Sequence, residues 1–250
     1  MYPILEFDSS IDAVINPSHH YKPINGAEYC VMCFFKEVIE NVLRSHKIKI
    51  ISVLKSEMGE LPLYQMNYKG KNVAFFLSGV GAALAAGLFE ETIAHGFTKF
   101  VACGGAGVLD RNIQCGKIII PNAAVRDEGV SYHYVAPSRE IEISEQVVTI
   151  LAKVLDKQGI DYMLGKTWTT DAFYRETKNR VEKRKSEGCC TVEMECSAFA
   201  AVAQFRKVKF GQYLYGGDDI SGANWDPREW KKLSIREHLF WSAVEACINL

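Results

Sequence analysis

Two acidic segments in the C-terminal half of the sequence have the composition of a site for acid-base chemistry. The first, VEME, carries Glu193 and Glu195. The second, GGDD, carries Asp218 and Asp219. Two carboxyl groups in different surroundings can act as a proton donor and as an anion that stabilises a developing cation. These residue types therefore predict one catalytic site that uses both segments.

The elements predicted around these carboxylates form a βαβ unit. An apolar run over residues 189–194 indicates a strand, and Phe199, Val202 and Phe205 mark one face of the helix after it. A second apolar strand spans residues 210–215 and ends at two glycines. Such a unit predicts two neighbouring parallel strands, buried on both faces. Because ligands bind at the carboxyl ends of strands in open α/β sheets, the two acidic segments are expected to share a site.

Glycine-rich segments follow two earlier predicted strands. Gly79 and Gly81 form a tight turn between a strand at residues 72–77 and a helix that ends near His95. The segment GGAG, residues 104–107, ends a strand predicted at 100–103 and leaves room for a flat ligand. The first turn lacks the third glycine of a dinucleotide fingerprint, since Leu84 stands there, so no nicotinamide site is predicted.

Alternating strands and helices along the rest of the chain predict a single α/β domain with three layers, αβα. The further strands are expected at residues 29–35, 48–54, 117–121 and 161–169. The further helices are expected at residues 36–43, 144–159, 174–187 and 234–249. Residues 1–27 are rich in proline and lack periodicity, so we expect an N-terminal arm at 1–27 and the domain at 28–250.

Composition excludes several classes of function. The 250 residues carry a net charge of −1, which gives no electrostatic basis for binding nucleic acid or an anionic membrane. No signal segment or run of about 18 apolar residues is visible. Eight cysteines without a signal segment indicate a reducing compartment, so a cytoplasmic location is expected. Cys30 and Cys33 form a CxxC pair without a second pair at zinc-site spacing, and no metal site is predicted.

Several motifs, taken in order, resemble the nucleoside phosphorylase family of purine nucleoside phosphorylases, uridine phosphorylases and the related methylthioadenosine/adenosylhomocysteine nucleosidases. The motifs are SGVGAALAAG, GGAG, RDEGVSYHY, DAFYRET, VEMECSA and GGDDISG. The resemblance runs from about Tyr29 to Gly222. It implies a mixed, partly barrel-like central sheet flanked by helices, a homo-oligomer (dimer or hexamer), and no organic cofactor or metal.

The resemblance implies that VEME binds the ribose of a nucleoside. Glu195 would hold the 2′- and 3′-hydroxyls, Met194 would pack under the sugar, and Glu193 would lie close by. Breaking an N-glycosidic bond builds positive charge on the ribose, and a carboxylate beside the sugar stabilises that charge.

The resemblance places the base between GGAG and the DAFYRET segment. Phe173 would stack on the base beside the backbone of Ala106 and Gly107, with Val192 nearby. Asp218 would be the general acid that protonates purine N7, which neutralises the negative charge of the leaving base.

The sequence departs from the phosphorylases in the residues that would bind the molecule that accepts the sugar. Those enzymes bind phosphate with two arginines and a hydroxyl residue, and here Glu37, Ala102 and Gly105 stand at about those places. A dianion without these arginines loses charge-assisted hydrogen bonds of about 1.5–3 kcal/mol each. A pocket for phosphate or water is expected at Gly79, Gly104 and Gly105. Three cations were candidates to compensate: Lys36, Lys55 and Arg126.

Three functions follow from this resemblance. The first is phosphorolysis of a nucleoside, with inorganic phosphate as co-substrate and ribose 1-phosphate as a product. The second is hydrolysis, with Glu37 as the base that activates water, as in the nucleosidases. The third is a catalytically weakened relative that binds nucleosides.

Two features bear on the substrate and on assembly. Asp218 favours a purine over uridine, because uridine enzymes carry a neutral residue there, and a Trp225/Trp230 loop would border the base pocket. His19 or His20 of the arm would complete the ribose site of a neighbouring subunit.

Overall fold

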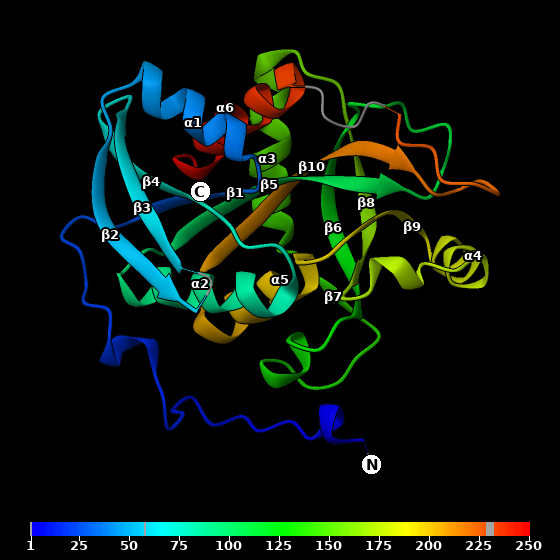
Figure 1. Ribbon diagram of the computed structural model, residues 1–250, viewed down its shortest axis with the longest axis horizontal. Helices are drawn as coiled ribbons and strands as arrows, with labels where there is room; N and C mark the ends of the chain where they lie inside the picture. The colour runs from blue at the N-terminus through cyan, green and yellow to red at the C-terminus, as the bar shows by residue number, and fades with distance from the viewer. Residues whose placement is uncertain (1, 58, 229–232) are drawn as a thin grey trace.

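The protein is described by a computed structural model that covers residues 2–57, 59–228 and 233–250. A mixed sheet occupies its centre, and helices pack around it (Figure 1). The strands are β1 (Tyr29–Cys33), β2 (Lys49–Ser56), β3 (Gly59–Tyr68), β4 (Lys71–Leu77), β5 (Lys99–Val108), β6 (Ile118–Asp127), β7 (Glu140–Glu142), β8 (Tyr162–Thr170), β9 (Cys189–Glu193) and β10 (Lys209–Asp219). The α-helices are α1 (Lys36–Ser45), α2 (Ala82–Ala94), α3 (Glu145–Gln158), α4 (Lys178–Ser186), α5 (Cys196–Arg206) and α6 (Leu233–Cys247).

Part of the sheet closes on itself. The strand order is β10-β6-β8-β9-β5-β1-β4-β3-β2, and β10 also pairs with β5. Strands β5, β9, β8, β6 and β10 therefore form a ring, from which β1 to β4 extend as an open sheet. This arrangement confirms the predicted α/β class with a mixed, partly barrel-like sheet.

The predicted parallel βαβ unit is wrong. Strand β9 pairs with β5 in the antiparallel sense, whereas β10 pairs with β5 in the parallel sense. The two strands joined by α5 thus lie on opposite sides of β5 and run in opposite directions. Strand β5 lies between β9 and β10, although it ends at Val108 and β9 begins only at Cys189. Local apolar patterns cannot reveal a neighbour that is so distant in the sequence. The two acidic segments still reach one cavity because the ring is closed.

The GGAG segment is part of a strand and not its end. Strand β5 continues through it to Val108, paired with β10 on one side. A Cβ atom on Gly105 would lie 3.1 Å from Cε1 of Tyr215, and one on Gly104 would lie 3.2 Å from Cδ2 of Phe34. The glycines are needed because aromatic rings pack directly on the backbone there. Likewise, β10 continues through its own glycines to Asp219.

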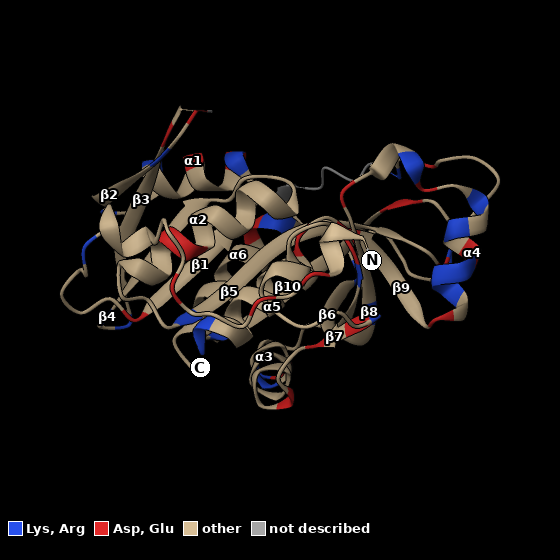
Figure 2. Cartoon of the chain, turned by 90° about the horizontal axis from the view of Figure 1, so that it is seen from below, with Lys and Arg blue, Asp and Glu red and all other residues tan. Residues whose placement is uncertain are grey.

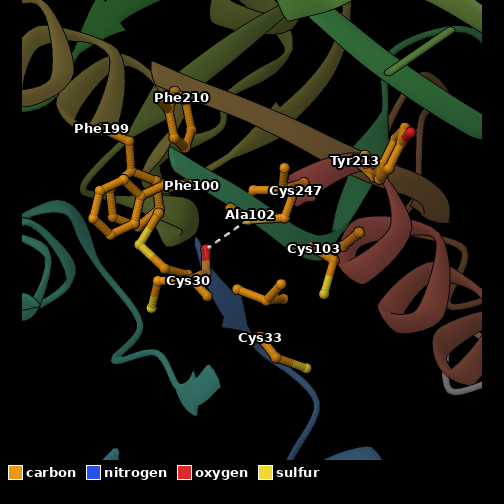
Figure 3. Close-up of a cluster of buried hydrophobic side chains, with 14 of the residues drawn as sticks. Cys30, Cys33, Phe100, Ala102, Cys103, Phe199, Phe210, Tyr213 and Cys247 are labelled. Carbon is orange, nitrogen blue, oxygen red and sulfur yellow. Dashed lines mark hydrogen bonds between the residues drawn. The ribbon is translucent and has the colours of Figure 1, made fainter. Parts of the chain in front are cut away.

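A buried aromatic cluster fixes α2 and α5 against the open part of the sheet. The ring of Phe89 lies 4.6 Å from that of Phe100 and 5.6 Å from that of Phe199, centroid to centroid. Figure 3 shows Phe100 and Phe199 of this cluster near the buried side chains of Cys30 and Cys247. Burial raises the pKa of both thiols, which accordingly act as apolar packing groups.

The segment 174–187 is helical over a shorter range than predicted. A 3-10 turn spans Phe173–Arg175, and α4 begins at Lys178. Lys and Arg residues are frequent on α4, which lies at the edge of the molecule (Figure 2), in agreement with a solvated helix face. Helix α4 packs near β9 and leaves the 3-10 turn at the mouth of the cavity described below.

The N-terminal segment lies along the outside of the domain (Figure 1). The backbone N–H of Ile24 donates to the carbonyl of His95 at 2.8 Å, and the guanidinium of Arg206 reaches the carbonyl of Ile11 at 3.5 Å. These contacts place the segment beside the ends of α2 and α5. None of the described helices combines the length and hydropathy that a membrane crossing needs.

Candidate active site

One cavity of about 1130 Å³ gathers most of the residues that the sequence predicts for the site. It opens where β5, β9 and β10 meet the 3-10 turn before α4. The predicted residues that line it are Gly104, Gly105, Ala106, Gly107, Phe173, Val192, Glu193, Met194, Glu195 and Asp218.

Glu193 and Glu195 are held at the junction of β9 and α5. The carboxylate of Glu193 accepts hydrogen bonds from the N–H groups of Glu195 (2.8 Å) and Cys196 (2.7 Å), and from the Thr169 hydroxyl at 2.6 Å. It therefore caps the start of α5, where the helix dipole favours an anion. Glu195 accepts a hydrogen bond of 2.5 Å from the N–H of Gly81, which fixes it beside the turn that precedes α2.

Both glutamates have pKa values above the ordinary range of a carboxyl group. Burial raises the pKa of Glu193 to about 7. Burial, with the charge of Glu193 as the next cause, raises the pKa of Glu195 to about 8. The pair is therefore poised to share protons and hydrogen bonds with hydroxyl groups that enter the cavity.

Asp218 lines the same cavity and lies over the backbone of β5. A Cβ atom on Gly107 would lie 3.6 Å from Oδ1 of Asp218 and 3.1 Å from Cγ1 of Val192. The indole N–H of Trp225 donates to Oδ2 of Asp218 at 2.7 Å. Trp225 also lines the cavity, as predicted for that loop, whereas Trp230 lies outside the described residues. We define Gly107, Val192, Asp218 and Trp225 as the base end of the cavity.

Glu176 is a cavity residue that sequence reasoning missed. It follows the 3-10 turn that begins at Phe173 and lines the same cavity as Asp218. Burial, followed by the charge of Asp218, raises the pKa of Glu176 to about 7. The half-exposed ring of Phe173 lines the cavity as well. The only signal for Glu176 in the sequence was its place in the DAFYRET motif.

Arg236, in the first turn of α6, brings a guanidinium group into the cavity. Its Nε donates to the Tyr215 hydroxyl at 3.0 Å, and its guanidinium carbon lies 5.0 Å from the centre of the Phe35 ring. Its Nη1 forms an ion pair with Glu37. We define Gly104, Gly105, Tyr215, Arg236 and Gln212 as the acceptor end of the cavity. Sequence reasoning missed Arg236 because it follows the last recognised motif and sits in a helix read only by its capping pattern.

Two predicted site residues do not line the cavity. Glu37 forms an ion pair with the lining residue Arg236, and its side chain is 40% exposed. Gly79 has a packing role, because a Cβ atom there would lie 2.4 Å from Leu84, while the next residue, Val80, reaches the cavity.

The three cations expected to compensate for missing arginines lie elsewhere. Lys36 pairs with the exposed Glu40 on its own helix, α1, and Lys55 in β2 pairs with the exposed Glu60 in β3. Arg126 is buried, and its guanidinium binds the hydroxyls of Ser131 and Ser138. The expectation that they compensate is therefore wrong. Lys178 and Arg236 are the basic residues that line the cavity among those described.

His19 and His20 lie exposed on the N-terminal segment, away from this cavity. Their role in a neighbouring subunit stays a prediction. Within the described ranges, no group of three or more His, Cys, Asp or Glu side chains is arranged to hold a metal ion.

The chain belongs to the Phosphorylase superfamily, whose profile matches residues 28–236. The match confirms the resemblance read from the motifs.

Relatives with different substrates are similar to this chain. A uridine phosphorylase of Thermococcus kodakarensis is 30% identical over 158 residues, which cover 60% of this chain and 57% of that protein. A guanosine phosphorylase of Halorubrum lacusprofundi is 24% identical over 64% of this chain and 66% of its own. The chain thus spans less than two thirds of the length of these two relatives.

The same fold occurs in a solved structure, a purine nucleoside phosphorylase of Toxoplasma gondii in complex with immucillin-H. The two superpose with a TM-score of 0.76 at 18% identity, over 93% of this chain and 92% of the other.

Proposed function

We propose that this protein cleaves the N-glycosidic bond of a nucleoside, with a purine preferred to uridine. The observation that carries the proposal is that Glu195 and Asp218 line one cavity together with Phe173. Gly104 and Gly107, at the two ends of the cavity floor, are three residues apart on β5, which corresponds to about 10 Å along a strand. That length suits a sugar and a base lying side by side.

The chemistry divides between the two carboxyl groups. Glu195, held by the N–H of Gly81, forms hydrogen bonds with the ribose hydroxyls, and its ionised form favours the positive charge that develops on the sugar. Asp218, at the base end, donates a proton to N7 of the purine as the bond breaks. Phe173 covers the base from the open side.

The first candidate for the acceptor is inorganic phosphate, which makes the reaction a phosphorolysis that yields ribose 1-phosphate. Two relatives named above are phosphorylases, which supports this choice. Arg236 supports it as well, because it brings a guanidinium group to the acceptor end beside Gly105 and Tyr215.

The second candidate is water, which makes the reaction a hydrolysis. The ion pair between Glu37 and Arg236 favours it, because the pairing offsets the positive charge that a phosphate dianion needs. Four carboxyl groups also line the cavity: Glu176, Glu193, Glu195 and Asp218. In this reaction Glu37 would be the base, acting from the rim of the acceptor end.

A panel of nucleosides tests the proposal. Base release is measured in phosphate buffer and in phosphate-free buffer, and the sugar product is identified as ribose 1-phosphate or ribose. Phosphate-dependent release from purine nucleosides supports the first candidate, and release of free ribose without phosphate supports the second. Binding without release of any base would leave only a nucleoside-binding relative and would end the enzymatic proposal.

A further inference from the structure

Three exposed aromatic rings line the cavity. They belong to Phe173, Tyr174 and Trp225, which are 50%, 88% and 63% exposed. The centres of the Phe173 and Tyr174 rings lie 4.1 Å apart. Exposed groups of large apolar side chains mark binding surfaces, and the face of an aromatic ring attracts a positive charge. These three rings, which we call the aromatic rim, therefore suit a flat ligand that carries a positive charge.

Glu176 brings an unpaired carboxyl group beside the aromatic rim. It directly follows the 3-10 turn that carries Phe173 and Tyr174, and its backbone N–H donates to the carbonyl of Phe173 at 3.3 Å. Its side chain lines the cavity and is only partly buried, so a ligand in the cavity can reach it. None of the described residues forms a hydrogen bond or an ion pair with this carboxyl group.

Acidic groups outnumber basic groups in the cavity. The described charged residues that line it are Glu176, Glu193, Glu195, Asp218, Lys178 and Arg236. Arg236 lies at the acceptor end and is paired with Glu37. Lys178, at the start of α4, forms no ion pair with Glu176 or Asp218. Because both of these carboxyl groups line the cavity without a cationic partner nearby, the side of the cavity that holds the base attracts positive charge.

We propose that this site also cleaves nucleosides whose base already carries a positive charge, such as pyridinium nucleosides. Glu176 and Asp218 would attract the charge, and the aromatic rim would stack on the cationic ring. This inference rests on the proposed function and adds a class of substrate to it. A neutral purine gains stacking from the same rings, but it gains no attraction from the two carboxylates.

Cleavage of such a nucleoside needs no general acid. The acceptor oxygen forms the bond to C1′, the bond from C1′ to the base nitrogen breaks, and its electron pair neutralises the positive charge of the base. The base leaves as a neutral molecule without a proton from Asp218. With water as the acceptor, one proton of the water passes to solvent. With hydrogen phosphate, the proton stays on the sugar phosphate.

Nicotinamide riboside is the probe, because its pyridinium ring keeps its charge at every pH, and guanosine is the neutral comparison. We expect the wild-type chain to release nicotinamide under the conditions in which it cleaves guanosine. At pH 7.5, Glu176→Gln should raise the KM for nicotinamide riboside about tenfold and change the KM for guanosine by less than about twofold, because the amide carries no charge. Glu182→Gln, on the exposed face of α4, is the matched control and should change neither KM.

Asp218→Asn should affect the two substrates differently. We expect kcat for guanosine to fall about 100-fold, since the proton donor is lost, and kcat for nicotinamide riboside to stay within about threefold of the wild type. The pH response should differ as well. Glu176 has a pKa of about 7 and gains its negative charge as the pH rises, so the KM for nicotinamide riboside should fall between pH 6 and 8.

The outcomes distinguish this inference from the proposed function. Cleavage of guanosine without binding or cleavage of nicotinamide riboside would overturn the inference and leave the proposed function intact. Equal changes of both KM values in Glu176→Gln would also overturn the inference, since a residue that only supports the structure would act on both substrates. Absence of cleavage of either nucleoside by the wild-type chain would overturn both proposals.

Discussion

The indole N–H of Trp225 donates a hydrogen bond of 2.7 Å to Oδ2 of Asp218. Both oxygens of this carboxylate lie close to Gly107, at 3.6 Å and 3.7 Å from where a Cβ atom on Gly107 would be. The proposed acid is thus oriented by a residue that is itself 63% exposed. In the proposed function, Oδ1, which the indole does not bind, would be the oxygen that protonates the base.

Replacement of the proposed acid should abolish turnover but not binding. We expect Asp218→Asn to lower kcat for a purine nucleoside by about 100-fold or more, because the amide cannot donate a proton to N7. Isothermal titration should give a dissociation constant close to that of the wild type. Asp219→Asn is the matched control, because Asp219 is not among the cavity residues. Equal kcat in Asp218→Asn and the wild type would contradict the assignment.

Loss of the indole should impair orientation of the acid. We expect Trp225→Phe, which keeps an aromatic ring but lacks the N–H donor, to lower kcat about three- to tenfold, as one hydrogen bond of about 1 kcal/mol is lost. Steady-state kinetics with a purine nucleoside provides the measurement. The same loss in Trp225→Phe and in the double variant with Asp218→Asn, each relative to its parent, would show that the two residues act independently and would refute the coupling.

The buried glutamates predict how stability depends on pH. The pKa of Glu195 in the folded chain is about 8, above its ordinary value of 4.5, so folding takes up a proton between these values. Stability of the empty protein should therefore fall as the pH rises from about 5 to 8. Glu195→Gln, which stays neutral, should melt about 2–4 °C above the wild type at pH 8, and the difference should shrink at pH 5.

Calorimetry at several pH values measures this effect. Glu182→Gln, a substitution of an exposed glutamate on α4, serves as the control and should show no pH-dependent difference from the wild type. If Glu195→Gln melts below the wild type at pH 8, the glutamate is not a destabilising buried anion in the empty site.

Glu176 should set the alkaline side of the activity profile. Its pKa of about 7 means that it gains a negative charge beside Asp218 as the pH rises through neutrality. A second negative charge opposes the electron density that the leaving base acquires, so kcat should decline above pH 7. Glu176→Gln should flatten this decline, and the test is the pH profile of kcat between pH 6 and 9. An unchanged decline in the variant would assign it to another group.

Sequence reasoning located most of the residues that line the candidate site because short motifs carry them. VEME and GGDD mark strand ends, and Gly104 to Gly107 mark a backbone on which rings pack. The same reasoning failed for contacts between distant segments. Gln212 lies in an apolar strand, and its place in the cavity lining depends on the register of β10 with β5, in which it pairs with Ala102. Arg236 comes from the last helix, and its approach to Tyr215 depends on how that helix packs.

Strand order was equally beyond local patterns. The apolar runs of β9 and β10 were located closely, yet their relative direction depends on β5, which lies between them. Closure of the ring is a property of the whole sheet, so neither periodicity nor spacing along the chain reveals it.

The contact of Gly105 with Tyr215 couples any new side chain on this part of β5 to the position of Arg236. A Cβ atom at position 105 would lie 3.1 Å from Cε1 of Tyr215, so a serine or threonine there requires the ring to shift by a few tenths of an ångström. The Tyr215 hydroxyl accepts a hydrogen bond from Nε of Arg236, so a shift of the ring also displaces the partner of that guanidinium. A mutational route toward a hydroxyl-lined anion pocket therefore also changes the setting of the arginine, and directed evolution would need to select compensating changes in both.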